Sequence, residues 1–179
     1  MLELFIGSIF LSNVTLNNYL GLRLDKKSNV INILTSIVAF ISSIANYYLY
    51  KLLIDYKIDY LKNIVFILVI FIVSYLICLI YNKKYKDSII PIIMTNSFVL
   101  GISLIVNLDY NIYELLVYNA GITLGYILIM WLINYLNNEF NKRKVLVSFR
   151  GYPIILITLS ILYILLGRMW GIIWRKDLH

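Results

Sequence analysis

The stretch "PIIMTNSFVLGISL", residues 91–104, decides how this chain is interpreted. It lies in a very apolar region, yet it begins with a proline and carries Thr95, Asn96 and Ser97 in succession, followed by Gly101. A helix that only crossed a bilayer would have no use for adjacent polar side chains flanked by helix breakers. Backbone groups leave helical pairing at membrane depth only where protein or a polar cavity satisfies them. The stretch therefore predicts an interrupted helix beside a polar site.

The composition predicts an all-α integral membrane protein. Hydrophobic residues make up 61% of the 179 residues and charged residues 14%, whereas soluble chains are roughly half apolar and a quarter charged. The apolar residues gather in six runs of about twenty residues, enough for a helix to cross a hydrocarbon layer of about 30 Å. We expect six transmembrane helices in a single membrane domain, 1–179, with spans over 2–22, 30–54, 63–82, 89–107, 112–136 and 152–174.

The first run is expected to stay in the protein as a span. Glu3 stands where a signal peptide carries basic residues, and no small-x-small cleavage pattern follows. Cys78 is the only cysteine and His179, the last residue, is the only histidine. This chain alone therefore offers no disulfide, no multi-cysteine cluster site and no imidazole metal site, and we predict no metal bound by it.

The basic residues predict the orientation, because cytoplasmic loops retain positive charge. Ten of the 16 Lys and Arg residues fall in the loops after the first, third and fifth spans. We therefore expect a multi-pass protein of the cell (inner or cytoplasmic) membrane with both termini outside. The net charge of +7 then reflects topology and lipid headgroups, and no soluble basic face remains for nucleic acid.

Two halves of the chain echo each other. Residues 15–22 read "TLNNYLGL" and residues 95–102 read "TNSFVLGI", so that Gly21 and Gly101 occupy matching places. Each stretch opens a unit of three spans, 1–82 and 89–174, and a tandem unit with an odd number of spans inserts in opposite directions. The pattern predicts a 3+3 inverted repeat with interrupted first and fourth helices.

The two interruptions are expected to face one central site. Asn side chains cap freed backbone groups, and Gly tolerates the φ values that a break requires. The alternative is that small and polar residues here only hold neighbouring helices together. The predicted central site comprises Asn17, Asn18, Gly21, Arg23, Thr95, Asn96, Ser97 and Gly101.

The same residues resemble a known family. "LNNYLGLR" (16–23), "PIIMTNSFVLGISL" (91–104) and "SFRGYPIILIT" (148–158) resemble motifs of the six-span membrane subunits of the Rnf and Nqr ion-translocating electron-transport complexes, of the RnfA/NqrE type. The resemblance covers essentially the whole chain. It implies pairing with a homologous six-span subunit of opposite orientation and with other complex subunits. It also implies a [2Fe–2S] cluster held at mid-membrane depth by cysteines of both subunits, and electron transfer coupled to Na⁺ or H⁺ movement.

The cluster-binding positions depart from the family pattern. Arg23 and Ser97 stand where the family has its two cysteines, and Leu24 replaces the proline after the first of them. An arginine offers iron no lone pair, and a serine hydroxyl is a poor ligand. We therefore predict that this chain binds no cofactor of its own, although a shared [2Fe–2S] cluster is the family expectation.

Two basic positions have alternative roles. Arg23 either extends to the cytoplasmic headgroups beside Lys26 and Lys27, or faces the bundle centre and pairs with an anion or a partner's carboxylate. Arg150 and Gly151, at the cytoplasmic start of the last span, face the same choice, and the anchoring role is the one we expect.

The functional interpretations that remain are membrane roles. The first is a non-catalytic subunit of a redox-driven ion translocase. The second is a small-solute transporter, or a substrate-binding membrane component, that uses the same inverted-repeat fold. A third is a scaffold in the place of a lost redox subunit. The sequence contains no catalytic triad, phosphate-binding glycine loop or metal-ligand spacing of a soluble enzyme.

Overall fold

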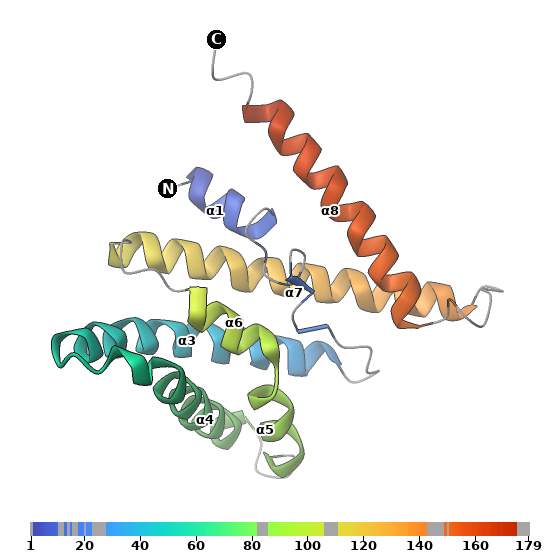
Figure 1. Cartoon of the computed structure of the whole chain (residues 1–179). Helices are drawn as coiled ribbons and strands as arrows, with labels where there is room; N and C mark the ends of the chain where they lie inside the picture. Colours follow the sequence, from blue (N-terminus) through green and yellow to red (C-terminus); the bar gives the residue numbers. More distant parts are fainter. Residues whose placement is uncertain are drawn as a thin grey trace.

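The structure, a computed structural model, is entirely helical in the part of the chain that it describes (Figure 1). The described residues are 2–10, 13, 15, 18–19, 21–22, 28–81, 86–105, 111–142, 149 and 151–174. The helices are α1 (Leu2–Phe10), α3 (Ser28–Asp55), the 3-10 helix η1 (Asp59–Leu61), α4 (Lys62–Tyr81), α5 (Lys86–Met94), α6 (Ser97–Ile105), α7 (Ile112–Lys142) and α8 (Tyr152–Trp174).

Three of these helices are long and apolar enough to cross a membrane. They cover Asn29–Asp55, Asp59–Ile80 and Ile112–Lys142, and Tyr152–Arg168 forms a shorter apolar helix. The ends of α3, α4 and α8 agree with the predicted runs to within about two residues, the usual uncertainty of helix ends. The all-α class and the long apolar spans are therefore confirmed.

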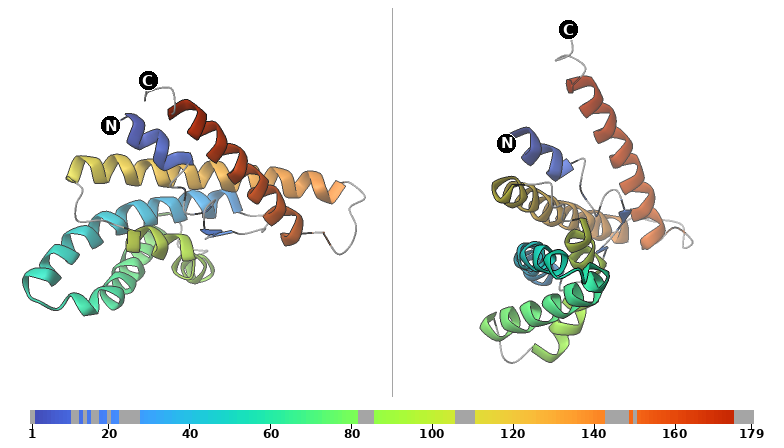
Figure 2. Two further views of the ribbon diagram at one scale, coloured as in Figure 1. Left: turned by 45° about the horizontal axis from the view of Figure 1, so that its top comes forward. Right: turned by 60° about the vertical axis from the view of Figure 1, so that its left-hand side comes forward.

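α3 lies at the centre of the bundle. It packs against α7 on one side and against α4 and α6 on the other, and α1 and α8 lie beyond α7 (Figures 1 and 2). α3 and α7 run antiparallel: the Asn134 side-chain amide donates to Asn29 Oδ1 at 2.9 Å, and Ser36 Oγ donates to the Thr123 carbonyl at 3.4 Å. The core between these helices is apolar, with Val38, Ile93, Phe98, Ile122 and Met130 fully buried.

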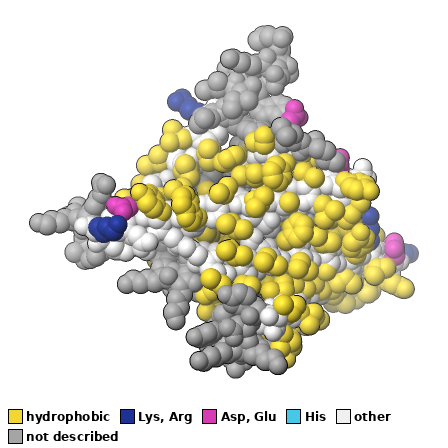
Figure 3. All heavy atoms as spheres, turned by 180° about the vertical axis from the view of Figure 1, so that it is seen from behind, with side chains coloured by type: hydrophobic (Ala, Val, Ile, Leu, Met, Phe, Trp, Pro, Cys, Tyr) yellow, Lys and Arg dark blue, Asp and Glu magenta, His cyan; other side chains and the backbone are white. Residues whose placement is uncertain are grey.

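Large apolar side chains cover the outside of the molecule. α4 exposes Ile64, Ile67, Leu68, Phe71 and Ile72, and the face drawn in Figure 3 is mostly hydrophobic, with charged side chains toward its margins. An apolar exterior of this extent is typical of a surface that meets lipid or other apolar helices rather than water.

Two predicted runs are not single helices. The run 89–107 is divided between α5, which ends at Met94, and α6, which begins at Ser97. In the run 2–22, α1 ends at Phe10, and the later residues Asn13, Tyr19 and Leu22 are not helical. The interruptions expected in both runs are therefore present among the described residues.

One predicted boundary was wrong. The fifth span was expected to end at residue 136 and to be followed by a polar connection, but α7 continues to Lys142. Its last turns are polar, and there Lys142 Nζ pairs with Glu139 Oε1 at 2.8 Å, three residues apart on the same helical face. A helix leaving the bilayer keeps its internal hydrogen bonds in water, so the polar sequence does not end it.

A close helix contact joins α1 to α7. A Cβ added at Gly121 would collide with the Ser8 hydroxyl, and a Cβ added at Gly125 would lie 2.6 Å from the Ile9 carbonyl oxygen. Both glycines belong to the sequence "GITLG", the Gly-x-x-x-Gly spacing that lets two membrane helices approach closely. The spacing is visible in the sequence, but the helix that it receives is not.

Candidate functional site

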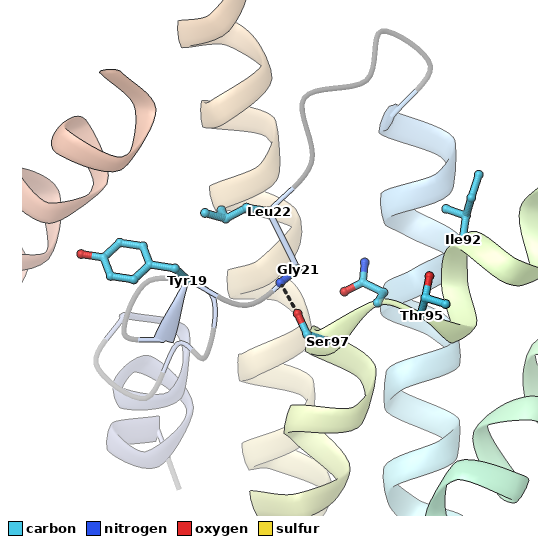
Figure 4. Close-up of a pocket in the computed structure, with 7 residues that line it drawn as sticks. Tyr19, Gly21, Leu22, Ile92, Thr95 and Ser97 are labelled. Atoms are coloured by element: carbon cyan, nitrogen blue, oxygen red, sulfur yellow. Dashed lines mark hydrogen bonds between the residues drawn. The ribbon is translucent and has the colours of Figure 1, made fainter. Parts of the chain in front are cut away.

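A cleft of about 330 Å³ opens where the two interrupted runs meet (Figure 4). One wall comes from the segment after α1 and the other from the junction between α5 and α6. The residues lining it are Tyr19, Gly21, Leu22, Ile92, Thr95, Asn96 and Ser97. The lining is polar but carries no charged side chain among the described residues. The structure thus brings both predicted clusters to one site.

The wall between α5 and α6 is built by local capping. Pro91 lies inside α5, and its carbonyl accepts hydrogen bonds from the Thr95 backbone N–H at 3.0 Å and from Thr95 Oγ1 at 2.7 Å. The Asn96 N–H donates to the Ile93 carbonyl at 3.1 Å. These bonds satisfy carbonyls at the end of α5 that would otherwise lie unpaired at membrane depth.

Asn96 caps the start of α6. Its Oδ1 accepts the Phe98 backbone N–H at 2.9 Å, and its side-chain amide lies 3.4 Å from the Tyr126 hydroxyl of α7. The Phe98 and Tyr126 rings stack at a centroid distance of 4.0 Å. Asn96 is buried, so it holds the break against the central helices.

We expect Asn96→Ala to destabilise the protein by about 1–2 kcal/mol, because the N-cap bond to α6 is lost. Asn96→Ser is the matched control, since serine also caps helices but does not reach Tyr126. Apparent melting temperatures in detergent compare the variants, and equal losses in both would contradict the capping role.

Gly21 closes the cleft across the two halves. Its backbone N–H donates to Ser97 Oγ at 3.0 Å, and its φ of +80° lies in the region that favours glycine. A Cβ at this position would lie 2.7 Å from Phe98 Cβ and 2.9 Å from Asn96 Oδ1. Only glycine therefore fits between the walls as they stand.

Replacing Ser97 tests this link. Ser97→Ala removes the acceptor for the Gly21 N–H, and an intramolecular hydrogen bond of this kind contributes about 1 kcal/mol. We expect a correspondingly lower melting temperature, whereas Ser97→Thr, which keeps a hydroxyl, should stay close to the unmodified protein. A Ser97→Thr variant as unstable as Ser97→Ala would show that the hydroxyl is not what matters.

Tyr19 ties the cleft to the last helix. Its φ of 55° is unusual for a bulky residue, and its hydroxyl lies 2.8 Å from Ser160 Oγ of α8. Neither residue was among the predicted site residues. An aromatic residue beside Asn18 and Gly21 belongs to the repeated pattern, but no sequence signal points to Ser160.

Asn13 plays, after α1, the part that Asn96 plays after α5. Its side-chain amide donates to the Ile9 carbonyl at 2.9 Å, and its Oδ1 accepts the Thr15 backbone N–H at 3.0 Å. Both asparagines thus accept the N–H two residues ahead. Asn13 was not predicted, because it lies just outside the stretch 15–22 that matches residues 95–102.

The other predicted site residues are placed differently. Asn18 is exposed and does not line the cleft. Gly101 is buried inside α6 and away from the break, so the break in this half is made by Thr95 and Asn96 without a glycine. Gly151 has a φ of +90° directly before α8, as the start of the last span requires. The predicted residues Asn17, Arg23 and Arg150 lie outside the described residues.

The residues of the cleft do not fit a [2Fe–2S] cluster. Such clusters are held by thiolates, with histidine as the known replacement, and the described cleft residues include neither. The hydroxyl of Ser97, at a family cysteine position, already accepts the Gly21 N–H. The one cysteine, Cys78, is buried in α4 and does not line the cleft. No group of His, Cys, Asp and Glu suited to a metal ion occurs among the described residues.

Long apolar helices around a polar cleft at a helix break define a multi-pass integral membrane protein with discontinuous helices. More particularly, the chain belongs to the family described as "Rnf-Nqr subunit, membrane protein", which matches residues 1–170. It is thus a membrane subunit of the Rnf/Nqr type, and the family expected from the motifs is confirmed.

Curated relatives of similar length support the assignment, and each is named as the A component of a membrane complex. That of the ion-translocating oxidoreductase complex of Buchnera aphidicola subsp. Baizongia pistaciae is 29% identical over 177 residues, covering 90% of this chain and 91% of that protein. That of the Na(+)-translocating ferredoxin:NAD(+) oxidoreductase complex of Acetobacterium woodii is 27% identical over 179 residues, covering 92% and 93%. That of the ion-translocating oxidoreductase complex of Shigella boydii serotype 4 is 29% identical over 176 residues, covering 90% and 91%.

Proposed function

We propose that this chain is the A component of an ion-translocating oxidoreductase complex in the cell membrane. The family match over residues 1–170 supports this role, together with relatives of that name that align over nine-tenths of the chain. The single structural observation that carries the proposal is the cleft between the two interrupted runs. It joins residues far apart in the chain, as a central site in such a complex requires.

The proposal includes a definite topology. The chain forms six spans as an inverted repeat, 1–82 and 89–174, within one membrane domain, with both termini outside. Two interrupted runs that meet at one cleft support this arrangement, as do the paired asparagine caps Asn13 and Asn96. The chain pairs with a homologous six-span partner of opposite orientation, and the exposed apolar faces of α4 and α8 provide surface for that partner and for lipid.

In the complex, this chain contributes packing and part of the ion path rather than cluster ligands. The supporting observation is chemical: the cleft offers hydroxyl, amide and backbone groups, which bind water and ions through oxygen but do not replace thiolate on iron. Electron carriers would then be held by other subunits. Whether Na⁺ or H⁺ moves is a property of the whole complex.

Affinity purification tests the proposed role in a complex. A tag on this chain, with mild detergent extraction from its native host and mass spectrometry, should recover flavin-bearing subunits together with a second six-span subunit in constant proportion. The Gly167→Ala variant is a suitable control, because no described atom lies within 4 Å of a Cβ added there. Isolation of the chain alone as a stable and active protein would contradict the proposal.

A small-solute transporter is the second candidate. The cleft volume of about 330 Å³ falls at the lower end of small-molecule pockets, and its lining is uncharged among the described residues. This candidate expects solute-dependent thermal stabilisation of the purified chain, and Ser97→Ala should weaken that stabilisation. A broad solute panel without any such shift would eliminate it.

A further inference from the structure

A second polar feature lies inside the bundle, apart from the cleft. Asn46 of α3, Ser74 of α4 and Asn119 of α7 are exposed by at most 1%. Both polar atoms of the Asn46 side chain, Ser74 Oγ and Asn119 Nδ2 have no hydrogen-bond partner within the described part of the chain. We call these three residues the polar layer. Neither the cleft nor the family assignment accounts for it.

Helix register places Ser74 level with the middle of α3. The antiparallel helices α3 and α4 meet where the Tyr50 and Phe66 rings lie 6.1 Å apart. An equal distance from this contact along each helix leads to Ser42 on α3 and Ser74 on α4. Asn46 is one helical turn from Ser42, so Ser74 and Asn46 lie about 6 Å apart along the bundle axis.

The contact of α3 with α7 brings Asn119 to the same level. One turn from the Ser36–Thr123 hydrogen bond, Asn119 lies beside the segment 40–44 of α3. The three members of the polar layer therefore occupy a slab about 9 Å thick along the axis. Asn119 is also about 10 Å along α7 from Tyr126, which separates the polar layer from the cleft.

Leaving these atoms unpaired is unfavourable in this setting. A buried polar group without a partner costs free energy, and the hydrocarbon around a membrane domain supplies no hydrogen bonds. Three such side chains on three different helices at one level indicate a shared partner rather than three separate defects. Ordered water is the usual partner of otherwise unsatisfied buried groups, and each water requires two to four polar neighbours.

The donor set identifies the ligand class. Asn46 Nδ2 and Asn119 Nδ2 are donors, while Asn46 Oδ1 is an acceptor and Ser74 Oγ is both. A metal cation requires acceptors alone and favours carboxylates. The acidic side chains that the structure describes lie at or beyond helix ends, and none of them is buried. Water, which donates and accepts, matches this mixture.

We propose that the polar layer binds ordered water between α3, α4 and α7 in the interior of the membrane domain. The bound water would link three helices that otherwise meet through apolar contacts. It would also give the domain a hydrated point that is separate from the cleft.

Cys78 provides the reporter for a test. It lies one turn from Ser74 on the buried face of α4 that also includes Phe66 and Ile70, and it is exposed by only 3%. Hydroxyl radicals generated from water oxidise neighbouring sulfur rapidly. Met130, fully buried and on α7, is an internal reference with a second sulfur on the opposite side of Tyr126 from Asn119.

The experiment is X-ray hydroxyl-radical footprinting of the purified complex in H₂¹⁸O, read by mass spectrometry. We expect oxidation of Cys78 well above background, and a several-fold decrease in the Asn46→Leu/Ser74→Ala variant, while Met130 oxidation stays constant. Asn119→Leu serves as an independent variant with the same expected decrease. Background oxidation of Cys78 in the unmodified complex, or oxidation that persists in both variants, would overturn the proposal.

Discussion

Gly125→Ala is expected to lower the apparent melting temperature of the detergent-solubilised protein by roughly 5–10 °C, as overpacking by about 1–3 kcal/mol implies for a chain of this size. The added Cβ would lie 2.5 Å from Asn13 Nδ2, 2.6 Å from the Ile9 carbonyl oxygen and 3.2 Å from Ile9 Cα. Two of these atoms are backbone, so no side-chain rotation relieves the contact. α1 must move away from α7.

The displacement should also break a specific hydrogen bond. Asn13 Nδ2 donates to the Ile9 carbonyl, and both atoms lie at the site of the new methyl group. The end of α1 would lose its cap together with its packing. Substitution at Gly121 should have a smaller effect, because its nearest contact is the Ser8 hydroxyl, which is able to rotate.

Gly167→Ala is the matched control for this prediction. Gly167 lies in α8, and no described atom is within 4 Å of a Cβ added there. Alanine raises helix propensity, so stability should be unchanged or slightly increased. A Gly125→Ala protein as stable as Gly167→Ala would show that α1 does not pack on this part of α7.

Gly21→Ala is expected to have the second large effect. The residue combines a φ of +80° with contacts of 2.7 Å to Phe98 Cβ and 2.9 Å to Asn96 Oδ1. The backbone conformation alone costs an L-residue about 1–2 kcal/mol, and overpacking adds about 1–3 kcal/mol. Both effects separate Gly21 from Ser97 and open the cleft.

Gly151→Ala separates these two contributions. Gly151 has a φ of +90°, but no described atom lies within 4 Å of its added Cβ, so only the backbone cost applies. The difference in melting temperature between the two variants measures the packing of the cleft walls. Recovery of the partner subunits with tagged protein should fall for Gly21→Ala and not for Gly151→Ala. Equal behaviour of the two variants would contradict the cleft geometry.

The helix break was predictable because its chemistry is local. Thr95 and Asn96 bond to backbone atoms within four residues, so their types and order indicate the interruption without knowledge of the rest of the fold. The same reasoning located Gly21. The all-α class followed from run length and hydropathy, which depend only on the dimensions of the bilayer.

Long-range partners were not predictable in this way. Tyr126 and Ser160 reach the site from helices far away in the chain, and no local pattern connects them to residues 19–22 or 95–97. Gly101 was matched to Gly21 by alignment, but a helix interior also accepts glycine, so the match carried no information about the break. Asn13 was missed because the matching stretches begin at Thr15.

Iron quantification with EPR on the complex purified through a tag on this chain tests the central claim most directly. That claim is that the cleft is a hydrogen-bonded site in a member of the Rnf-Nqr family and supplies no cluster ligand. Unmodified protein, Ser97→Ala and Ser97→Thr are compared after reduction. The account predicts the same iron content per complex and the same [2Fe–2S] signal, of whatever size, in all three. A [2Fe–2S] signal that disappears with Ser97→Ala, while the complex still assembles, would contradict it.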